Sequence, residues 1–324
     1  MKKLSMVLAA LSAIVPYASF AADSARSYPS KPVRMIVGYA PGGGSDIMGR
    51  LIAQELTKAY GQQMIVENRP GAAQNVAAEL VARSPADGYT LFMSSAALGV
   101  NVSLYPKLNY DPVKDFAPMA LFAISPNLLL VHPSLPARTV KEFIAFAKKN
   151  PGKLNFSSSG SGSTQHLSGE MLKVMSGIAI VHVPYRGTAP SMTALISGEV
   201  EFSFANIPSS LNYVQQNRLR AIAITSAKRS PLLPNLPTMI EGGVPGFETA
   251  TWYGLLAPAG TPRDIVMKVN QTVNAAVKNP EFNRRLADLG ADPVAETPEQ
   301  FLDYLRKEIT RWAKVVKASG AKPE

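Results

Sequence analysis

The chain reads Val33-Arg34-Met35-Ile36-Val37-Gly38-Tyr39-Ala40-Pro41-Gly42-Gly43-Gly44-Ser45-Asp46 near its N-terminus, and an amphipathic segment follows as far as Gly61. The first residues, rich in Val and Ile, predict a buried strand, and the glycines predict a loop after it. The amphipathic segment predicts a helix that Ser45 or Asp46 caps and Gly61 ends. A strand, a glycine loop and a helix N-terminus together present free backbone amides to an anion.

The residues of this loop, Tyr39–Asp46, do not fit three familiar sites. A dinucleotide fingerprint needs a third glycine where Ile47 stands, and a P-loop needs Lys and a hydroxyl where Arg50 and Leu51 stand. The loop also lacks the Gly-x-Ser-x-Gly motif of a nucleophile elbow. The sequence therefore favours a cradle for a carboxylate or a similar small oxyanion. A glycine turn that only packs the helix on the strand is the alternative.

The N-terminus predicts export. Residues 1–21 combine a basic start, a short apolar segment and small residues before the expected cleavage after Ala21, as a secretory signal peptide does. No later stretch is long and apolar enough to span a membrane. The absence of cysteine excludes disulfides, thiolate metal sites and an acylated N-terminal Cys. We therefore expect a mature protein that is soluble in the periplasm.

The net charge of +10 comes from scattered cations, with no more than two Lys or Arg in a row. This pattern argues against a nucleic-acid partner. The positive surface either helps to attract anions or reflects only solvated helix faces. We expect a monomer that binds a small anionic molecule.

Strand and helix patterns alternate along the chain, which predicts an α/β fold with mostly parallel sheets flanked by helices. Pro-rich sequence, which we expect to be irregular, interrupts this pattern at 105–126 and again at 230–246. We predict two domains, one from 22–124 plus 247–324 and the other from 125–246.

A second loop of the same kind, Ser157–Thr164, follows a predicted strand of the second domain and precedes a predicted helix. In open parallel sheets, ligands lie beyond the carboxyl ends of the strands, where the loops 39–46, 68–74 and 94–101 also lie. Two such loops, here called the first cradle (Tyr39–Asp46) and the second cradle (Ser157–Thr164), predict a ligand cleft between the domains.

The titratable residues form no catalytic or metal-binding pattern. His166 and Glu170 are four residues apart on one predicted helix, but zinc needs a third protein ligand. The serines of the second cradle have no acid partner or elbow motif to orient them. We expect no enzyme, no metal and no cofactor. His166 either contacts the ligand or packs against its helix, and Arg186 either meets a carboxylate or stays solvated.

Six motifs follow one another along nearly the whole chain: Pro41-Gly42-Gly43-x-x-Asp46, Val66-Glu67-Asn68-Arg69-Pro70-Gly71-Ala72, Asp87-Gly88-Tyr89-Thr90-Leu91, Val183-Pro184-Tyr185-Arg186-Gly187, Pro237-Thr238-Met239-x-Glu241 and Trp252-Tyr253-Gly254-Leu255-Leu256-Ala257-Pro258. Together they resemble the substrate-binding proteins of tripartite tricarboxylate transporters, also called Bug receptors. The resemblance implies a type II-like periplasmic binding protein whose two domains close on a small carboxylate and deliver it to a membrane transporter. The implied ligands are di- and tricarboxylates, acidic amino acids and aromatic acids.

The resemblance also implies the residues that contact the ligand, by position: Tyr39, Ala40, Gly42, Gly43, Ser45, Asp46, Ser94 and Ser95 in the first domain, and Ser157, Ser159, Gly160, Ser161, His166, Arg186, Gly187, Ala205 and Asn206 in the second. Ala205 stands where many relatives carry an acidic residue that pairs with a ligand amine. Its presence favours a simple or aromatic carboxylate over an amino acid. Two alternatives are a receptor that presents its ligand to a signalling partner and a periplasmic hydrolase that uses Ser159 or His166.

Overall fold

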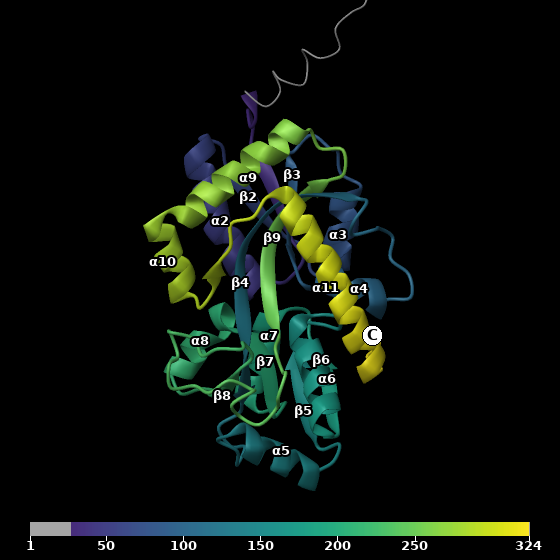
Figure 1. The fold of residues 1–324 in the computed structure, drawn as a ribbon, viewed down its shortest axis with the longest axis vertical. Coiled ribbons are helices and arrows are strands. Elements are labelled where there is room, and N and C mark those ends of the chain that lie inside the picture. Colours follow the sequence, from purple (N-terminus) through teal and green to yellow (C-terminus); the bar gives the residue numbers. More distant parts are fainter. Residues whose placement is uncertain (1–26, 324) are drawn as a thin grey trace, which may run out of the picture.

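One long strand, β4 (Phe116–Val131), belongs to both sheets of the computed structural model, which describes residues 27–323 (Figure 1). The predicted signal peptide, residues 1–21, lies outside the described residues. As far as Pro126, β4 pairs with β9 (Ala250–Pro258) in the first sheet, and from Asn127 onward it pairs with strands of the second sheet. We call the elements around these sheets the first lobe and the second lobe.

The first lobe surrounds a mixed sheet. Its further elements are β1 (Val33–Val37), α2 (Gly44–Tyr60), β2 (Met64–Asn68), α3 (Asn75–Ala82), β3 (Thr90–Ser95), α4 (Ala97–Leu104), α9 (Arg263–Lys278), α10 (Pro280–Asp288), β10 (Asp292–Pro293) and α11 (Pro298–Ser319). β1 runs parallel to β2 and β3, and β9 joins β3 to β4 by antiparallel pairing. The strand ends that precede α2 and α4 therefore lie at the same edge of the sheet.

The second lobe repeats this plan around its own mixed sheet. Its elements are α5 (Val140–Lys149), β5 (Leu154–Ser158), α6 (Thr164–Ser176), β6 (Ile180–Pro184), α7 (Thr188–Ser197), β7 (Phe202–Asn206), α8 (Ile207–Gln215) and β8 (Arg220–Ile224). β5 is parallel to β6 and β7, whereas β4 is antiparallel to β7 and β8. The predicted α/β class with two lobes is thus the observed fold. The exact domain bounds stay a prediction.

Apolar packing fixes the position of the first cradle. The apolar stripe of α2, including Met48, Ile52 and Leu56, lies in one buried cluster with Val269 and Val273 of α9. Burying a side chain of this size contributes about 1.5–3 kcal/mol. Since β1 pairs with β2 on one side and with β3 on the other, the loop that joins β1 to α2 has both of its ends held in place.

The structure corrects two expectations about irregular sequence. The segment 105–126 was expected to be irregular throughout, but residues 116–126 form the greater part of β4, with Pro118 beside a register shift and Pro126 where β4 leaves the first sheet. Proline is tolerated at bulges and strand ends, so the prolines concealed this strand. The expected loop 94–101 is also wrong in part, because α4 begins at Ala97.

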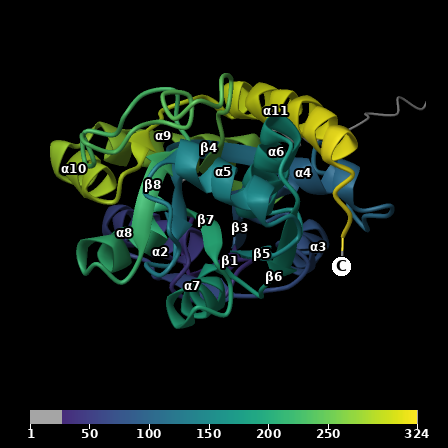
Figure 2. The same cartoon turned by 90° about the horizontal axis from the view of Figure 1, so that it is seen from below.

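Helix α11 extends from the first lobe toward the second (Figure 1), and in the view from below it lies beside α4 and α6 (Figure 2). It packs along α4, and its last turns contact α6 of the second lobe. Trp312 and Val316 of α11 form one apolar cluster with Val100 of α4 and Leu167 of α6. Among residues 27–323, each helix is too short or too polar to cross a bilayer.

Candidate functional site between the lobes

A small cavity of about 20 Å³ lies between the lobes, at the N-termini of α2 and α6. We call it the inner cavity. The described residues that line it are all uncharged: Tyr39, Gly43, Gly44, Ser45, Ser95, Ser159, Ser163, Thr164, Gln165, Thr188, Asn206 and Thr251. Such a volume holds about one water molecule or one small polar group. Both cradles contribute to this lining, as the sequence predicted for a site between them.

The first cradle ends in a helix terminus without a side-chain cap. The N-cap of α2 is Gly43, which corrects the expectation of Ser45 or Asp46, whereas Gly61 ends the helix as predicted. Within the described residues, the amides of Gly44 and Ser45 have no hydrogen-bond acceptor. The positive end of the helix dipole therefore faces the inner cavity with unpaired donors, which is an anion-binding arrangement.

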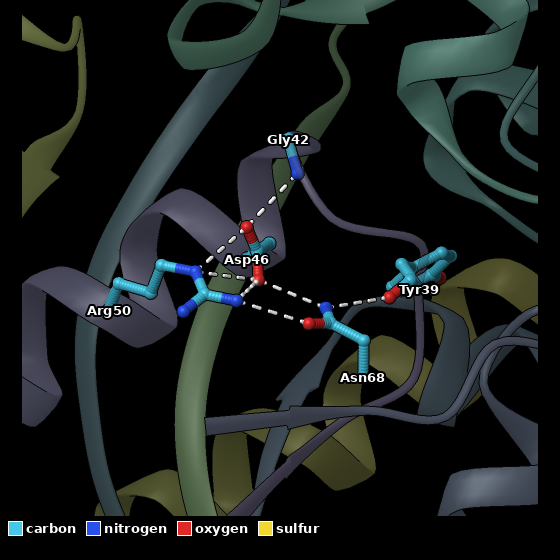
Figure 3. A network of polar contacts seen from close by, with 5 residues as sticks. All are labelled: Tyr39, Gly42, Asp46, Arg50 and Asn68. Atoms are coloured by element: carbon cyan, nitrogen blue, oxygen red, sulfur yellow. Dashed lines mark hydrogen bonds and ion pairs between the residues drawn. The ribbon is translucent and has the colours of Figure 1, made fainter. Parts of the chain in front are cut away.

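Asp46 holds the first cradle together (Figure 3). Its carboxylate accepts hydrogen bonds from the Gly42 amide at 3.0 Å and from Asn68 at 2.9 Å, and it forms an ion pair with Arg50 at 2.9 Å. Asn68 also donates to the Tyr39 carbonyl at 2.9 Å. Burial raises the pKa of Asp46, but these contacts with Arg50, Gly42 and Asn68 outweigh burial and hold the pKa below its usual value. The carboxylate thus shapes the loop through donors of the chain itself.

Gln74, which the sequence analysis did not single out, holds the backbone of Ser95 in the wall of the inner cavity. Its side chain pairs with the backbone of Ser95, donating to the carbonyl at 3.1 Å and accepting from the amide at 3.3 Å. Gln74 and the two residues before it, Ala72 and Ala73, have positive φ angles of 68°, 44° and 46°. Non-glycine residues rarely adopt this region, and each one costs of order 1–3 kcal/mol. Backbone strain is thus concentrated beside the cleft.

Tyr39 and Ser95 are brought together as predicted. The Ser95 hydroxyl donates to the Tyr39 hydroxyl at 3.4 Å, and burial raises the pKa of Tyr39 to about 12. The Tyr39 phenol is therefore a neutral group at the inner cavity. Ser94 is fully buried, and its hydroxyl has no hydrogen bond among the described residues.

The second cradle is ordered by a chain of side-chain hydrogen bonds. Gln165 accepts from the Ser159 amide at 2.7 Å and donates to Thr188 at 3.1 Å. The hydroxyls of Thr164 and Thr251 lie 2.6 Å apart and join the two lobes. The sequence analysis missed Gln165, Thr188 and Thr251. Gln165 and Thr188 each lie in the first turn of a helix that follows a predicted cradle or strand end. Their position in the sequence could therefore have identified them as site residues.

Three predicted site residues have side chains that lie in the second lobe, outside the lining of the inner cavity. Ser157 is fully buried and donates to the Ser191 carbonyl at 3.2 Å. Ala205 belongs to an apolar cluster that contains Leu128. His166 stacks on His182. That these three residues contact the ligand stays a prediction.

His166 and His182 form a buried stacked pair beneath the second cradle, with ring centroids 4.0 Å apart. His166 Nδ1 accepts from the Gly162 amide at 3.2 Å, and His182 Nε2 lies 2.6 Å from the Ser158 hydroxyl. Burial lowers the pKa of His166 to about 4 and, together with the neighbouring His166, the pKa of His182 to about 2. Both rings are neutral supports. The fully buried Ser158 hydroxyl is not placed to attack a substrate in either cavity.

A larger cavity of about 580 Å³ lies beside the inner one, and we call it the outer cavity. Tyr39 and Ser159 line both cavities, so the two are adjacent. Among the predicted residues, Gly160, Ser161 and Arg186 line the outer cavity, and Arg186 is exposed. A ligand that extends out of the inner cavity would therefore meet this guanidinium.

The lobes touch through glycines. A Cβ on Gly44 would lie 2.5 Å from Asn206 Oδ1 of the second lobe and 2.6 Å from the Tyr253 hydroxyl. A Cβ on Gly187, whose φ is 129°, would lie 2.9 Å from the Ala40 Cβ of the first lobe. Predicted residues Ala40, Gly187 and Asn206 thus lie where the first cradle meets the second lobe. The absence of side chains at Gly44 and Gly187 permits this close approach.

Two lobes joined by a shared strand, with uncharged donors from two helix N-termini facing a cavity between them, define a periplasmic binding protein. Within residues 27–323, no group of three or more His, Asp or Glu side chains is placed to hold a metal ion. Residues 48–321 match the family described as "Tripartite tricarboxylate transporter family receptor", and the chain belongs to this family.

Relatives of known sequence and structure agree with this assignment. Protein BugT of Bordetella pertussis is 37% identical over 322 residues, which cover 98% of this chain and 99% of that protein. The R. palustris protein Rpa4515, solved with adipate, has a TM-score of 0.90 and 40% identity, covering 92% of this chain and all of that one. MatC from Rhodopseudomonas palustris, solved with bound malate, has a TM-score of 0.85 and 35% identity, covering 89% of this chain and all of that one.

Proposed function

We propose that this protein captures a small organic carboxylate between its lobes and delivers it to a membrane transporter of the tripartite tricarboxylate type. The observation that carries the proposal is the inner cavity, where the uncapped N-terminus of α2 and the second cradle face each other with uncharged donors. Backbone amides at a helix N-terminus stabilise a carboxylate without a counter-ion. The adipate and malate bound by two relatives support this ligand class.

The two cavities suggest which part of the ligand each of them holds. The inner cavity has room for about one carboxylate group, so the rest of the ligand extends toward the outer cavity. There the exposed Arg186 is placed to pair with a second carboxylate. With Ala205 buried in an apolar cluster, an acidic partner for a ligand amine is lacking at this position. This arrangement favours a dicarboxylate or an aromatic acid over an amino acid.

The predicted signal peptide at residues 1–21 and the family relationship support a periplasmic location. We propose that the protein acts as a monomer and by binding alone, with no turnover of the acid. Closure of the lobes on the ligand gives the transporter a form of the receptor that differs from the empty one.

A thermal-shift and calorimetric screen tests the function. Protein unfolded and refolded to remove co-purified ligand is mixed with mono-, di- and tricarboxylates that include adipate and malate, and with adipamide as the uncharged control. A ligand at 100 times its Kd adds about 2.7 kcal/mol to folding stability, so the melting temperature rises. The proposal requires a shift with at least one acid, none with adipamide, and stoichiometric binding. A flat screen, or consumption of the acid, would refute it.

A further inference from the structure

Tyr253 carries a buried hydroxyl without a partner. The residue lies on β9, its side chain is fully buried, and its hydroxyl makes no hydrogen bond within the described residues. An unpaired polar group in the interior costs free energy that phenylalanine at the same position would avoid. Such a group calls for a partner that the chain itself does not supply.

The position of this hydroxyl points to the ligand as that partner. It lies 2.6 Å from where a Cβ on Gly44 would be, and the Asn206 side chain approaches the same point to 2.5 Å. Gly44 and Asn206 line the inner cavity from opposite lobes. Thr251, which lies two residues before Tyr253 on β9, also lines this cavity. The hydroxyl therefore lies at the seam between the lobes, beside the unpaired amides of the α2 N-terminus.

Two neighbouring polar side chains of the inner cavity, Thr251 and Asn206, already have partners in the chain. Thr251 contacts Thr164, and Asn206 Oδ1 accepts from the Ser209 hydroxyl at 2.6 Å. Burial raises the pKa of Tyr253 well above its usual value, so the phenol keeps its proton and can only serve as a neutral group. The Tyr253 O–H group is therefore available to donate a hydrogen bond to an anion in the neighbouring site.

We infer that the Tyr253 hydroxyl donates a hydrogen bond to a carboxylate oxygen of the bound ligand, next to the amides of Gly44 and Ser45. This inference rests on the proposed function and adds a side-chain donor to a cradle that otherwise binds through its backbone. A hydrogen bond to a charged group contributes enough that its removal weakens binding roughly tenfold to a hundredfold.

The test is Tyr253→Phe, with Tyr60→Phe as the matched control and adipate and malate as the probes. The Tyr60 hydroxyl has a partner of its own, donating to Thr272 at 2.9 Å, on a face of α2 that packs against α9. We measure Kd by calorimetry and the stability of the ligand-free protein by urea unfolding. Tyr253→Phe should weaken binding roughly tenfold to a hundredfold and leave ligand-free stability unchanged or higher. Tyr60→Phe should lower stability and leave Kd unchanged.

Each other outcome decides against the inference. If Tyr253→Phe binds within twofold of the wild type, the hydroxyl does not contact the ligand, while the proposed function stands. If Tyr253→Phe loses as much ligand-free stability as Tyr60→Phe, the hydroxyl has a structural partner instead. If the wild-type protein binds neither probe nor any other acid of the screen, the proposed function fails and this inference fails with it.

Discussion

The contact at Gly44 gives a sharp prediction for Gly44→Ala. The added Cβ would lie 2.5 Å from Asn206 Oδ1 and 2.6 Å from the Tyr253 hydroxyl, distances at which atoms must move apart. Neither neighbour yields easily, because Asn206 is held by Ser209 and Tyr253 is fully buried. Overpacking of this kind costs typically about 1–3 kcal/mol. The Asn206 share of this cost falls only on the closed arrangement of the lobes.

Because only the Asn206 share opposes closure, Gly44→Ala should weaken binding of the best acid from the screen by at most about 150-fold, at about 1.4 kcal/mol per factor of ten. Gly99→Ala in α4 is the matched control, since its Cβ would lie 3.4 Å from the Ile309 amide nitrogen, an ordinary contact, and Gly99 lines neither cavity. Calorimetry measures both Kd values, and small-angle scattering shows whether ligand still compacts each protein. If Gly44→Ala binds as tightly as Gly99→Ala, the lobes do not meet at Gly44 in the bound state.

Two further predictions concern groups that support the cradles. Asp46→Asn removes the charge that Arg50 and the Gly42 amide contact, so it should lower the free energy of unfolding at pH 7 by about 1–3 kcal/mol. An unchanged midpoint of urea unfolding would contradict this prediction. Because the folded-state pKa of Asp46 is lowered, its stabilisation exists above the unfolded pKa and disappears as pH falls through the folded pKa, so Asp46→Asn should have a flatter profile below about pH 4. The depressed pKa values of His166 and His182 mean that the unfolded chain takes up protons first, so stability should fall below pH 6.5 by up to about 1.4 kcal/mol per pH unit for each histidine. His182→Gln should reduce that slope between pH 6 and pH 4 in urea unfolding, and identical slopes in the two proteins would refute the assignment.

The first cradle could be predicted because its parts are contiguous. The strand before Gly38, the glycines and the stripe of α2 are local patterns, and local patterns carry the periodicity that separates strand from helix. The same reasoning failed for β4, whose prolines hide a strand that exists because β9, from 124 to 142 residues further along the chain, pairs with it. Partners that distant leave no local signal.

Side-chain direction limited the prediction of the site. Gln165 and His166 are adjacent, but neighbours on a helix point about 100° apart, so when Gln165 faces the inner cavity His166 faces the interior of the lobe. Ser157 and Ser158 likewise alternate along β5, and both hydroxyls are taken by the second lobe. Sequence placed these residues at the correct strand end, whereas their orientation depends on which face packs.

Helix α11 has a consequence for how the receptor rests without ligand. Its last turns place Trp312 and Val316 against Leu167 of the second lobe, while its earlier turns are fixed on the first lobe. Separating the lobes would expose this apolar contact to water, at about 25 cal/mol for each Å² uncovered. The contact thus stabilises the closed arrangement of the lobes in the ligand-free protein. The free energy of this contact sets the fraction of ligand-free protein that is closed, and this fraction determines how much of the intrinsic affinity appears in the measured Kd. Substitutions in α11, far from the cleft, can therefore change the Kd.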